Sequence, residues 1–219
     1  MKPLRICAVI VDKDIQAIKE AEPLADLFEV RIDLIGDGWQ KLARQLKKPW
    51  IACNRRLDEG GKWQQSEAKR IDELEKAIQL GADTIDIELR TKDLEQFIRQ
   101  FKGKAKFLIS FHEFRGTPPL EEMKKLVRRQ LALGADICKV VPTAQRLEDN
   151  LTVLQLIKEF PEVKIVAVAM GPLGLVSRVL CPLAGGYFTY ASVTEGKESA
   201  PGQITVANLK RIYEMLAGV

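Results

Sequence analysis

Apolar and polar residues follow two alternating patterns along this chain. Short runs of apolar, often β-branched residues are typical of buried strands, and longer stretches with apolar residues three and four positions apart are typical of amphipathic helices. The predicted strands cover Arg5–Val11, Leu27–Ile35, Trp50–Arg55, Thr84–Leu89, Lys106–His112, Asp136–Val141, Lys164–Met170 and Gly186–Val193. The predicted helices cover Lys13–Leu24, Gln40–Leu46, Glu67–Leu80, Leu94–Phe101, Leu120–Leu133, Arg146–Phe160, Gly174–Leu180 and Thr205–Leu216. This strict alternation indicates parallel strands joined by crossover helices.

The number of strand–helix units favours a closed barrel over an open sheet. Eight units are enough to close a (β/α)₈ barrel, also called a TIM barrel, whereas doubly wound sheets usually have fewer strands. Two helix–strand joints repeat nearly the same sequence and place Gly81 and Gly134 where a left-handed backbone commonly ends a helix. Neither of the glycine-rich nucleotide-binding motifs is present. We therefore predict an α/β protein with a single (β/α)₈ barrel catalytic domain over residues 1–219.

Composition limits which binding partners and which cellular compartment we expect for this protein. The 34 basic and 30 acidic residues are spread along the chain, so the net charge of +4 predicts no nucleic-acid partner and favours small anionic substrates. The apolar run from Ile6 to Val11 is too short to span a membrane and has no signal-peptide layout, which predicts a cytoplasmic protein without a membrane partner. The four cysteines form no CxxC pair and there is one histidine, so buried free thiols and no metal site are expected.

A lysine stands on the sixth predicted strand among apolar residues. Because side chains alternate along a strand, Lys139 shares a face with Ile137 and Val141. Burial among such neighbours disfavours a charged amine, and a neutral amine can attack a ketone to form an imine. The alternative is that Lys139 points outward between helices and extends its charged end to water.

The only histidine of the chain stands at the end of the preceding strand. The active site of a (β/α)₈ barrel lies at the carboxyl ends of its strands, so His112 and Lys139 are expected on the same face. Imidazole titrates near neutral pH and suits proton transfer in either direction. The alternative is a hydrogen-bonded structural histidine.

Charged residues also alternate on the second and fourth predicted strands. Glu29, Arg31 and Asp33 share one face, which in a barrel points into the lumen and requires pairing between the charges. Asp86 and Glu88 repeat the pattern on the fourth strand. Direct substrate contact and an ion network with the second strand both remain open for these two carboxylates.

Three loops at the same end of the barrel carry further candidates. Arg55 and Glu59 follow the third strand beside two glycines, and Arg178 falls in an early turn after the seventh strand, where it could clamp a carboxylate. The polar loop after the eighth strand ends in Ser199–Gln203 and is typical of a lid. Solvated loop charges, a surface arginine and a mobile loop are the alternatives.

Taken in order, these motifs match one enzyme family. They are Glu29-Val-Arg31-Ile-Asp33, Arg55 with Glu59-Gly60-Gly61, Ile85-Asp86-Ile-Glu88, Ser110-Phe-His112-Glu-Phe114, Lys139 followed by Val-Val-Pro142, Met170-Gly171 through Ser177-Arg178, and Ser199-Ala-Pro-Gly-Gln203. The ordered set spans nearly the whole chain and resembles the type I 3-dehydroquinate dehydratases. The resemblance implies a cofactor-free homodimeric lyase. Such an enzyme converts 3-dehydroquinate to 3-dehydroshikimate by syn elimination of water, the third step of the shikimate pathway that leads to chorismate and the aromatic amino acids.

The resemblance also implies a role for each candidate. Lys139 forms the imine, His112 carries the proton, and Glu59 orients or tunes the histidine. Arg178 holds the substrate carboxylate with help from Ser199 and Gln203 on the lid. The remaining matches are Glu29, Arg31 and Arg55 as contacts to the ring hydroxyls, and Phe114, Met170 and Tyr190 as apolar walls.

Some positions depart from the family pattern. Pro172 stands where many members carry a polar or basic residue, Tyr190 replaces a common phenylalanine, and the stretch between Tyr190 and Ser199 is slightly longer than usual.

Other functions are also considered. A Schiff-base aldolase or transaldolase would share the lysine but not the lid or the charged second strand. A barrel that only binds or assembles would be expected to lose Lys139, His112 or Arg178, and a metal-dependent hydrolase is disfavoured by the single histidine.

Overall fold

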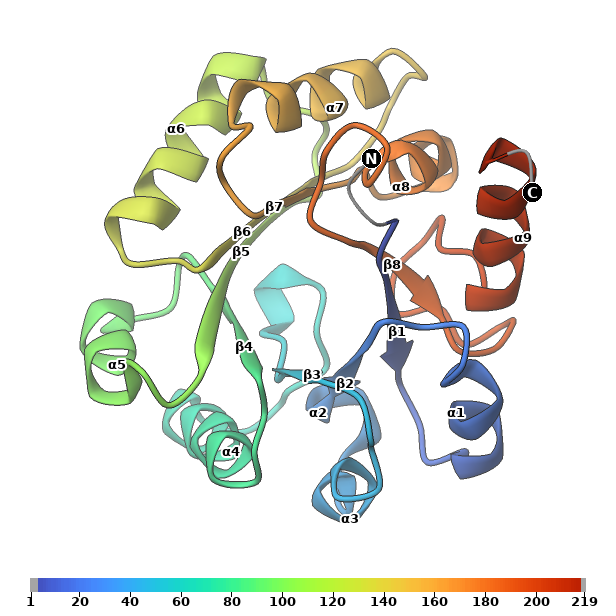
Figure 1. Ribbon diagram of the computed structural model, residues 1–219. Coiled ribbons are helices and arrows are strands. Elements are labelled where there is room, and N and C mark those ends of the chain that lie inside the picture. The colour runs from blue at the N-terminus through green and yellow to red at the C-terminus, as the bar shows by residue number, and fades with distance from the viewer. Residues whose placement is uncertain (1–3, 218–219) are drawn as a thin grey trace.

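A computed structural model describes residues 4–217 and shows a ring of strands surrounded by helices (Figure 1). All neighbouring strands are parallel, in the order β7-β6-β5-β4-β3-β2-β1-β8. The strands are β1 (Ile6–Ile10), β2 (Leu27–Arg31), β3 (Trp50–Cys53), β4 (Thr84–Glu88), β5 (Lys106–Glu113), β6 (Ile137–Pro142), β7 (Ile165–Ala167) and β8 (Thr189–Ser192). The two ends of the sheet meet where the backbone N–H of Tyr187 donates to the carbonyl of Ile165 at 2.7 Å. The predicted (β/α)₈ barrel is confirmed.

The helices cover the outside of the barrel, and each predicted helix is present. The α-helices are α1 (Ile15–Ala21), α2 (Ile32–Ile35), α3 (Trp39–Ala43), α4 (Glu67–Gln79), α5 (Leu94–Phe101), α6 (Leu120–Ala132), α7 (Asp149–Glu159), α8 (Leu175–Leu180) and α9 (Val206–Ala217). Two short 3₁₀ turns, η1 (Leu57–Glu59) and η2 (Pro172–Gly174), follow β3 and β7. Gly81 and Gly134 both adopt the predicted left-handed conformation, with φ of 89° and 90°.

The second predicted strand is shorter than the sequence suggested. β2 ends at Arg31, and the next four residues form α2. Asp33 therefore does not continue the lumen-facing row; its carboxylate receives two hydrogen bonds from the Arg31 guanidinium, at 2.9 and 2.8 Å, and one from the backbone N–H of Lys62 at 3.0 Å. The local bond between Arg31 and Asp33 favours a turn over a continued strand.

Apolar and charged residues occupy different halves of the lumen. Apolar side chains such as Val9, Ile51, Leu108 and Val166 form one buried cluster inside the barrel. Two larger apolar clusters lie between the sheet and the helices. Because the amino half is filled by apolar residues, the polar side chains of the strands gather toward the carboxyl ends, where an active site is expected in this fold.

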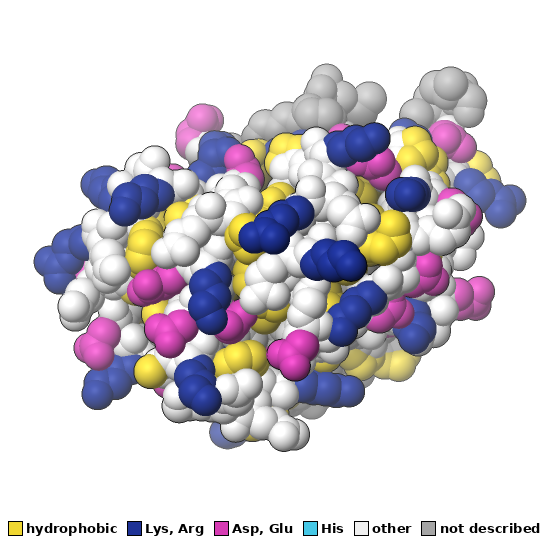
Figure 2. Space-filling model, turned by 90° about the horizontal axis from the view of Figure 1, so that it is seen from below, with side chains coloured by type: hydrophobic (Ala, Val, Ile, Leu, Met, Phe, Trp, Pro, Cys, Tyr) yellow, Lys and Arg dark blue, Asp and Glu magenta, His cyan; other side chains and the backbone are white. Residues whose placement is uncertain are grey.

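The outer surface carries mixed charge. On the face shown in Figure 2, basic and acidic side chains are interspersed and the hydrophobic ones are scattered between them. No helix within residues 4–217 combines the length and the apolar content that crossing a membrane requires.

Candidate active site

One cavity at the carboxyl ends of the strands is lined by every residue to which the family resemblance gives a role, whereas Asp33, Asp86 and Glu88 lie outside its lining. Its lining includes Lys139, His112, Glu59, Glu29, Arg31, Arg55, Arg178, Ser199, Gln203, Phe114, Met170 and Tyr190. These residues come from β2, β5, β6 and β8, from helix α8, and from the segments that follow β3, β5, β7 and β8. The barrel thus brings together groups that are up to 174 positions apart, from Glu29 to Gln203.

Lys139 points into the lumen, so the outward orientation considered for it is wrong. Its Nζ lies 2.8 Å from a carboxylate oxygen of Asp86 and 3.8 Å from one of Glu29, and it sits 4.3 Å from the centre of the Tyr190 ring. The residue is 5% exposed. The residues that share the Lys139 face of β6 are apolar as expected, but β2 and β4 supply carboxylates that contact the lysine. The resting lysine is therefore an ion-paired ammonium rather than an amine among apolar side chains.

The carboxylates of β4 join a buried ion-pair network, but their partners are not on β2 as considered from the sequence. Asp86 contacts Nη2 of Arg55 at 2.6 Å, and Glu88 contacts Nη1 of Arg55 at 3.1 Å. The hydroxyl of Ser110 donates to Asp86 at 2.6 Å and accepts from Arg55 at 2.7 Å. These cations hold the pKa of the Asp86 carboxyl below its usual range despite its burial. Asp86 is therefore a permanent anion beside Lys139.

His112 and Glu59 form a second pair at the cavity wall. Nδ1 of His112 lies 3.0 Å from Oε2 of Glu59, and the same oxygen accepts the backbone N–H of His112 at 3.2 Å. Burial, reinforced by the nearby positive charges of Arg55 and Lys139, lowers the pKa of His112 well below its usual value. Burial also raises the pKa of Glu59 to about 7. At neutral pH the imidazole is therefore an uncharged group that can accept a proton.

Arg178 approaches the cavity from α8 on the opposite side. It is 3% exposed, and burial lowers its pKa to about 10. Its hydrogen bond is to the Pro201 carbonyl at 3.3 Å; its Nε has no hydrogen-bond partner among the described residues, and none of their carboxylates pairs with it. A buried guanidinium without a counter-ion is costly, and a bound anion would compensate it.

The loop after β8 covers this arginine. The backbone N–H of Gly171 donates to the Pro201 carbonyl at 3.2 Å, which ties the loop to the segment after β7. Within the loop, the Ser199 hydroxyl and the Gln203 side chain hydrogen-bond to one another at 3.0–3.2 Å. A side chain at Gly202 would meet the Gly171 carbonyl, since an added Cβ would lie 2.3 Å from it. The close approach of the two loops therefore depends on glycine.

The apolar walls differ in how buried they are. Met170 and Tyr190 are buried, whereas Phe114 is 48% exposed and lies at the rim against Gly60. Arg31 and Arg55 line the cavity while bonded to Asp33 and Asp86 respectively.

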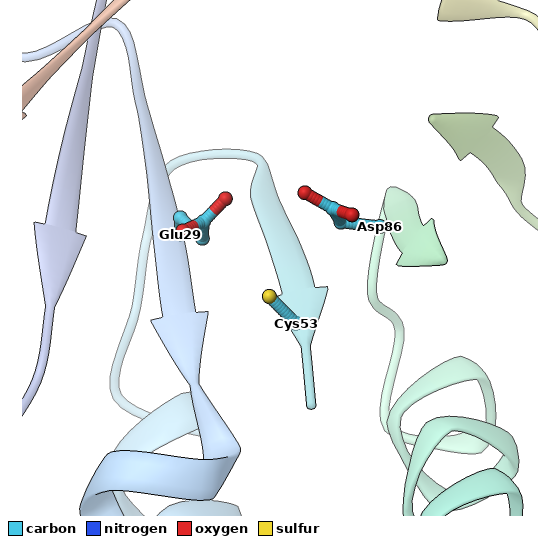
Figure 3. A group of neighbouring side chains, drawn as sticks. All are labelled: Glu29, Cys53 and Asp86. Atoms are coloured by element: carbon cyan, nitrogen blue, oxygen red, sulfur yellow. The ribbon is translucent and has the colours of Figure 1, made fainter. Parts of the chain in front are cut away.

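Three side chains under the cavity could in principle hold a cation. Glu29, Cys53 and Asp86 each bring a donor atom within 4.8 Å of the others, from β2, β3 and β4 (Figure 3). Lys139 and Arg55 already bind the Asp86 carboxylate, at 2.8 and 2.6 Å. Burial also raises the pKa of the Cys53 thiol. Protein cations thus already neutralise this set of donors.

One buried residue of the network was not recognised in the sequence. Arg70, on α4, is fully buried and contacts Glu88 at 2.9 Å. A signal was present, because Arg70 lies in register with the buried face of α4 that also carries Leu74, Ala77 and Ile78. A charged residue on the apolar face of a helix needs a buried partner.

Comparison with known proteins agrees with this geometry. The model of the family described as type I 3-dehydroquinase matches residues 6–218. A 3-dehydroquinate dehydratase from Dehalococcoides mccartyi strain BAV1 is 45% identical over 214 residues, covering 97% of this chain and 96% of that protein. The crystal structure of 3-dehydroquinate dehydratase from Geobacillus kaustophilus superimposes with a TM-score of 0.86 at 28% identity, covering 99% of this chain and 92% of that one.

A second solved structure gives the same result. The type I 3-dehydroquinate dehydratase from Clostridium difficile, crystallised with covalently modified comenic acid, has a TM-score of 0.84 at 26% identity and covers 98% of this chain and 92% of its own. The match to the family spans nearly all of the described residues and includes every strand of the barrel. The chain belongs to the type I 3-dehydroquinase family.

Proposed function

We propose that this chain removes water from 3-dehydroquinate to give 3-dehydroshikimate, through an imine on Lys139. Family membership supports the reaction and its place as the third step of the shikimate pathway. The observation that carries the mechanism is the meeting, in one cavity, of a lysine, a neutral imidazole and a buried guanidinium without a counter-ion among the described residues. We propose that residues 1–219 act as one catalytic domain.

The first step joins the substrate to the enzyme. The Lys139 ammonium loses one proton to solvent, and its nitrogen then attacks the ring ketone. A second proton moves from the nitrogen to the former ketone oxygen, and uptake of one proton from solvent lets that oxygen leave as water, which gives a protonated C=N bond, the iminium. Asp86 and Glu29 lie next to the nitrogen and stabilise positive charge there. They therefore also favour the iminium, which withdraws electrons from the adjacent carbon and makes its C–H bond acidic.

The second step is the elimination. The imidazole of His112 takes the proton from the carbon beside the iminium and then gives a proton to the departing hydroxyl, which leaves as water. Glu59 contacts Nδ1 and so leaves Nε2 for the substrate. Hydrolysis of the conjugated imine releases the enone product and regenerates Lys139, so one molecule of water is lost overall.

We propose that the other residues that line the cavity hold the substrate in its reactive orientation. Arg178 binds the substrate carboxylate, and Ser199 and Gln203 on the lid add hydrogen bonds to it. Glu29, Arg31 and Arg55 contact the ring hydroxyls, and Phe114, Met170 and Tyr190 enclose the ring. Removal of solvent by the lid strengthens each electrostatic contact.

A direct assay tests the reaction itself. Purified protein mixed with 3-dehydroquinate should produce the ultraviolet absorbance of a conjugated enone. A Lys139→Ala variant should lose at least about 10⁴-fold in rate, while Lys125→Ala, at an exposed lysine of α6, should keep full activity. Absence of enone from the wild-type protein would refute the proposed function.

We also propose that the protein is a homodimer. Five exposed apolar side chains lie around the start of α7 and the start of α8: Leu147, Leu151, Leu173, Leu175 and Val176. Asn150 joins these two regions, because its side chain donates to the carbonyls of Leu147 and Leu173 at 2.9 and 2.8 Å. Exposed apolar side chains that cluster in this way are typical of an interface, and a two-fold dimer buries the same surface on both copies.

Sedimentation measures this directly. The wild-type protein should sediment as a dimer, Leu151→Lys should sediment as a monomer, and Met215→Lys, at an even more exposed position on α9, should remain dimeric. A monomeric wild type, or an intact Leu151→Lys dimer, would contradict the assignment.

The cytoplasm is the proposed compartment. All four cysteines are buried and unpaired, as expected where thiols stay reduced.

A further inference from the structure

The guanidinium of Arg70 is the most fully bonded cation of the barrel's carboxyl end, yet it lies outside the cavity. It donates to both carboxylate oxygens of Glu67 at 2.8–2.9 Å and to the Asn54 carbonyl at 2.9 Å. It also donates to the Thr91 hydroxyl at 3.0 Å and pairs with Glu88 at 2.9 Å. Arg70 is not among the residues that line the cavity.

Arg70 is connected to the lysine by an unbroken series of ion pairs. Glu88 binds Arg70 with Oε2 and Arg55 with Oε1. Arg55 in turn binds Asp86 at 2.6 Å, and Asp86 binds Nζ of Lys139 at 2.8 Å. Each carboxylate of this series is shared between two cations, so a change at one end redistributes the pairing at the other.

We propose that Arg70 is a positioning residue for the reaction, which controls through these ion pairs how readily the Lys139 ammonium loses its proton. The proposal rests on the proposed function, since it concerns the imine-forming step. With Arg70 present, Glu88 is satisfied from two sides and leaves Arg55 free to bind Asp86. Arg55 then competes with Lys139 for Asp86 and weakens the hold of that carboxylate on the ammonium.

Loss of Arg70 should reverse this balance. Glu88 would draw Arg55 toward itself and away from Asp86, and the full charge of Asp86 would fall on Lys139. One positive charge would also be missing from the buried cluster. Both effects favour the charged form of the lysine, so imine formation should require a higher pH.

Other groups face the same nitrogen and remain in place in such a variant. The charged and titratable groups near Lys139 from the surrounding strands are Cys7 on β1, Glu29 on β2, Cys53 on β3, Asp86 on β4, His112 on β5 and Tyr190 on β8, with Arg55 just beyond β3. Arg70 touches none of these except through the Glu88–Arg55 contact, so its replacement changes the network from one end only.

The experiment follows imine formation against pH. Wild type and Arg70→Gln are incubated with 3-dehydroquinate at pH 6 to 9.5 and quenched into borohydride at one fixed pH, and the adduct on Lys139 is measured by mass spectrometry. We expect the midpoint of trapping to move upward in Arg70→Gln, with about tenfold less adduct at pH 7 at early times. Arg70→Lys, which keeps the charge without the planar fork, should restore the midpoint while remaining less stable.

The controls separate positioning from simple stabilisation. Arg99→Gln, at an exposed arginine of α5 paired to Glu95 at 3.7 Å, should leave the midpoint unchanged. If Arg70→Gln does not fold, Thr91→Val removes one of the Arg70 bonds and also the bond that the Thr91 hydroxyl donates to Glu88 at 3.3 Å. Both losses leave Glu88 and Arg70 less well held, so the midpoint should move in the same direction, with about threefold less adduct at pH 7.

Two results would overturn the proposal. One is a midpoint unchanged in folded Arg70→Gln, including a uniform loss of adduct at every pH, and the other is an unchanged midpoint in Thr91→Val where the glutamine variant cannot be tested. Failure of the wild-type protein to form any adduct would instead refute the proposed function.

Discussion

The two sides of the cavity differ in whether their buried cations have carboxylate partners. On the β3–β4 side, Arg55 and Lys139 are both held by carboxylates of β4 at 2.6–3.1 Å. On the α8 side, Arg178 is equally buried but pairs with no carboxylate among the described residues. The charges on the β3–β4 side are balanced before substrate binds. On the α8 side, the charge of Arg178 is balanced only when an anion binds.

This difference assigns a task to each side. A balanced network holds the lysine and its neighbours in fixed positions, so little reorganisation is needed during the reaction. An uncompensated guanidinium under a lid selects a negatively charged substrate, because only an anion removes the cost of its burial. We therefore propose that Arg178 binds the carboxylate of the substrate, while the balanced network holds the lysine that attacks the ketone.

Replacement of Arg178 should produce the largest change in activity. In Arg178→Gln the substrate carboxylate loses its buried partner, and we expect kcat/KM to fall by about 30- to 3,000-fold, mostly through KM. Steady-state kinetics with enone detection measure this, and Arg128→Gln on the outer face of α6 is the matched control. A normal KM in Arg178→Gln would show that the carboxylate binds elsewhere.

Replacing the buried arginine on each side of the cavity should change the free energy of unfolding of the protein by different amounts. Arg55→Gln leaves Asp86 and Glu88 with fewer cations and should reduce the free energy of unfolding by about 3–5 kcal/mol. Arg178→Gln removes a buried charge without a counter-ion and should leave the free energy of unfolding equal to that of the wild type or higher. Urea denaturation of the free proteins distinguishes them, and equal losses in the two variants would remove the contrast between the two sides.

The smallest expected effect concerns the pH dependence of proton transfer. Since the pKa of Glu59 is raised to about 7, its carboxylate ionises as pH rises from 6 to 8, and the new charge beside Nδ1 makes His112 a stronger base. The elimination rate should therefore rise by about fivefold over this range in the wild type, and Glu59→Gln should abolish the rise.

This rate must be separated from imine formation. Single-turnover enone formation at each pH is divided by the amount of imine trapped at the same time and pH. A rise that persists unchanged in Glu59→Gln would assign the titration to another group.

The sequence predicted which residues enter the site better than it predicted how they pair. Strand alternation put Lys139 on one face with Ile137 and Val141 and left open whether that face points into the lumen. Chain order placed His112 at the end of the adjacent strand, which follows from the parallel topology. The pairing of Asp86 with Lys139 joins residues 53 positions apart and is set by the register of β4, β5 and β6. Periodicity gives a side chain its face but does not give its neighbour across the lumen.

Local interactions explain the remaining differences. Asp33 was assigned to a strand by alternation, but its bonds to Arg31 form a turn that ends β2. Phe114 matched a wall residue but lies just beyond the end of β5, where the chain reaches the rim. Arg70 was overlooked because an arginine on a helix is usually solvated, although its register with Leu74 marked the buried face.

Trapping of the imine tests the central claim most directly. Wild-type protein is treated with borohydride in the presence of 3-dehydroquinate, digested and analysed by mass spectrometry, with Lys139→Ala and a substrate-free sample in parallel. We predict a single adduct carrying the mass of the reduced substrate or product on Lys139, lost in Lys139→Ala and increased in His112→Ala, where elimination is slow. Protein that forms enone at its normal rate without any adduct on Lys139 would contradict the account.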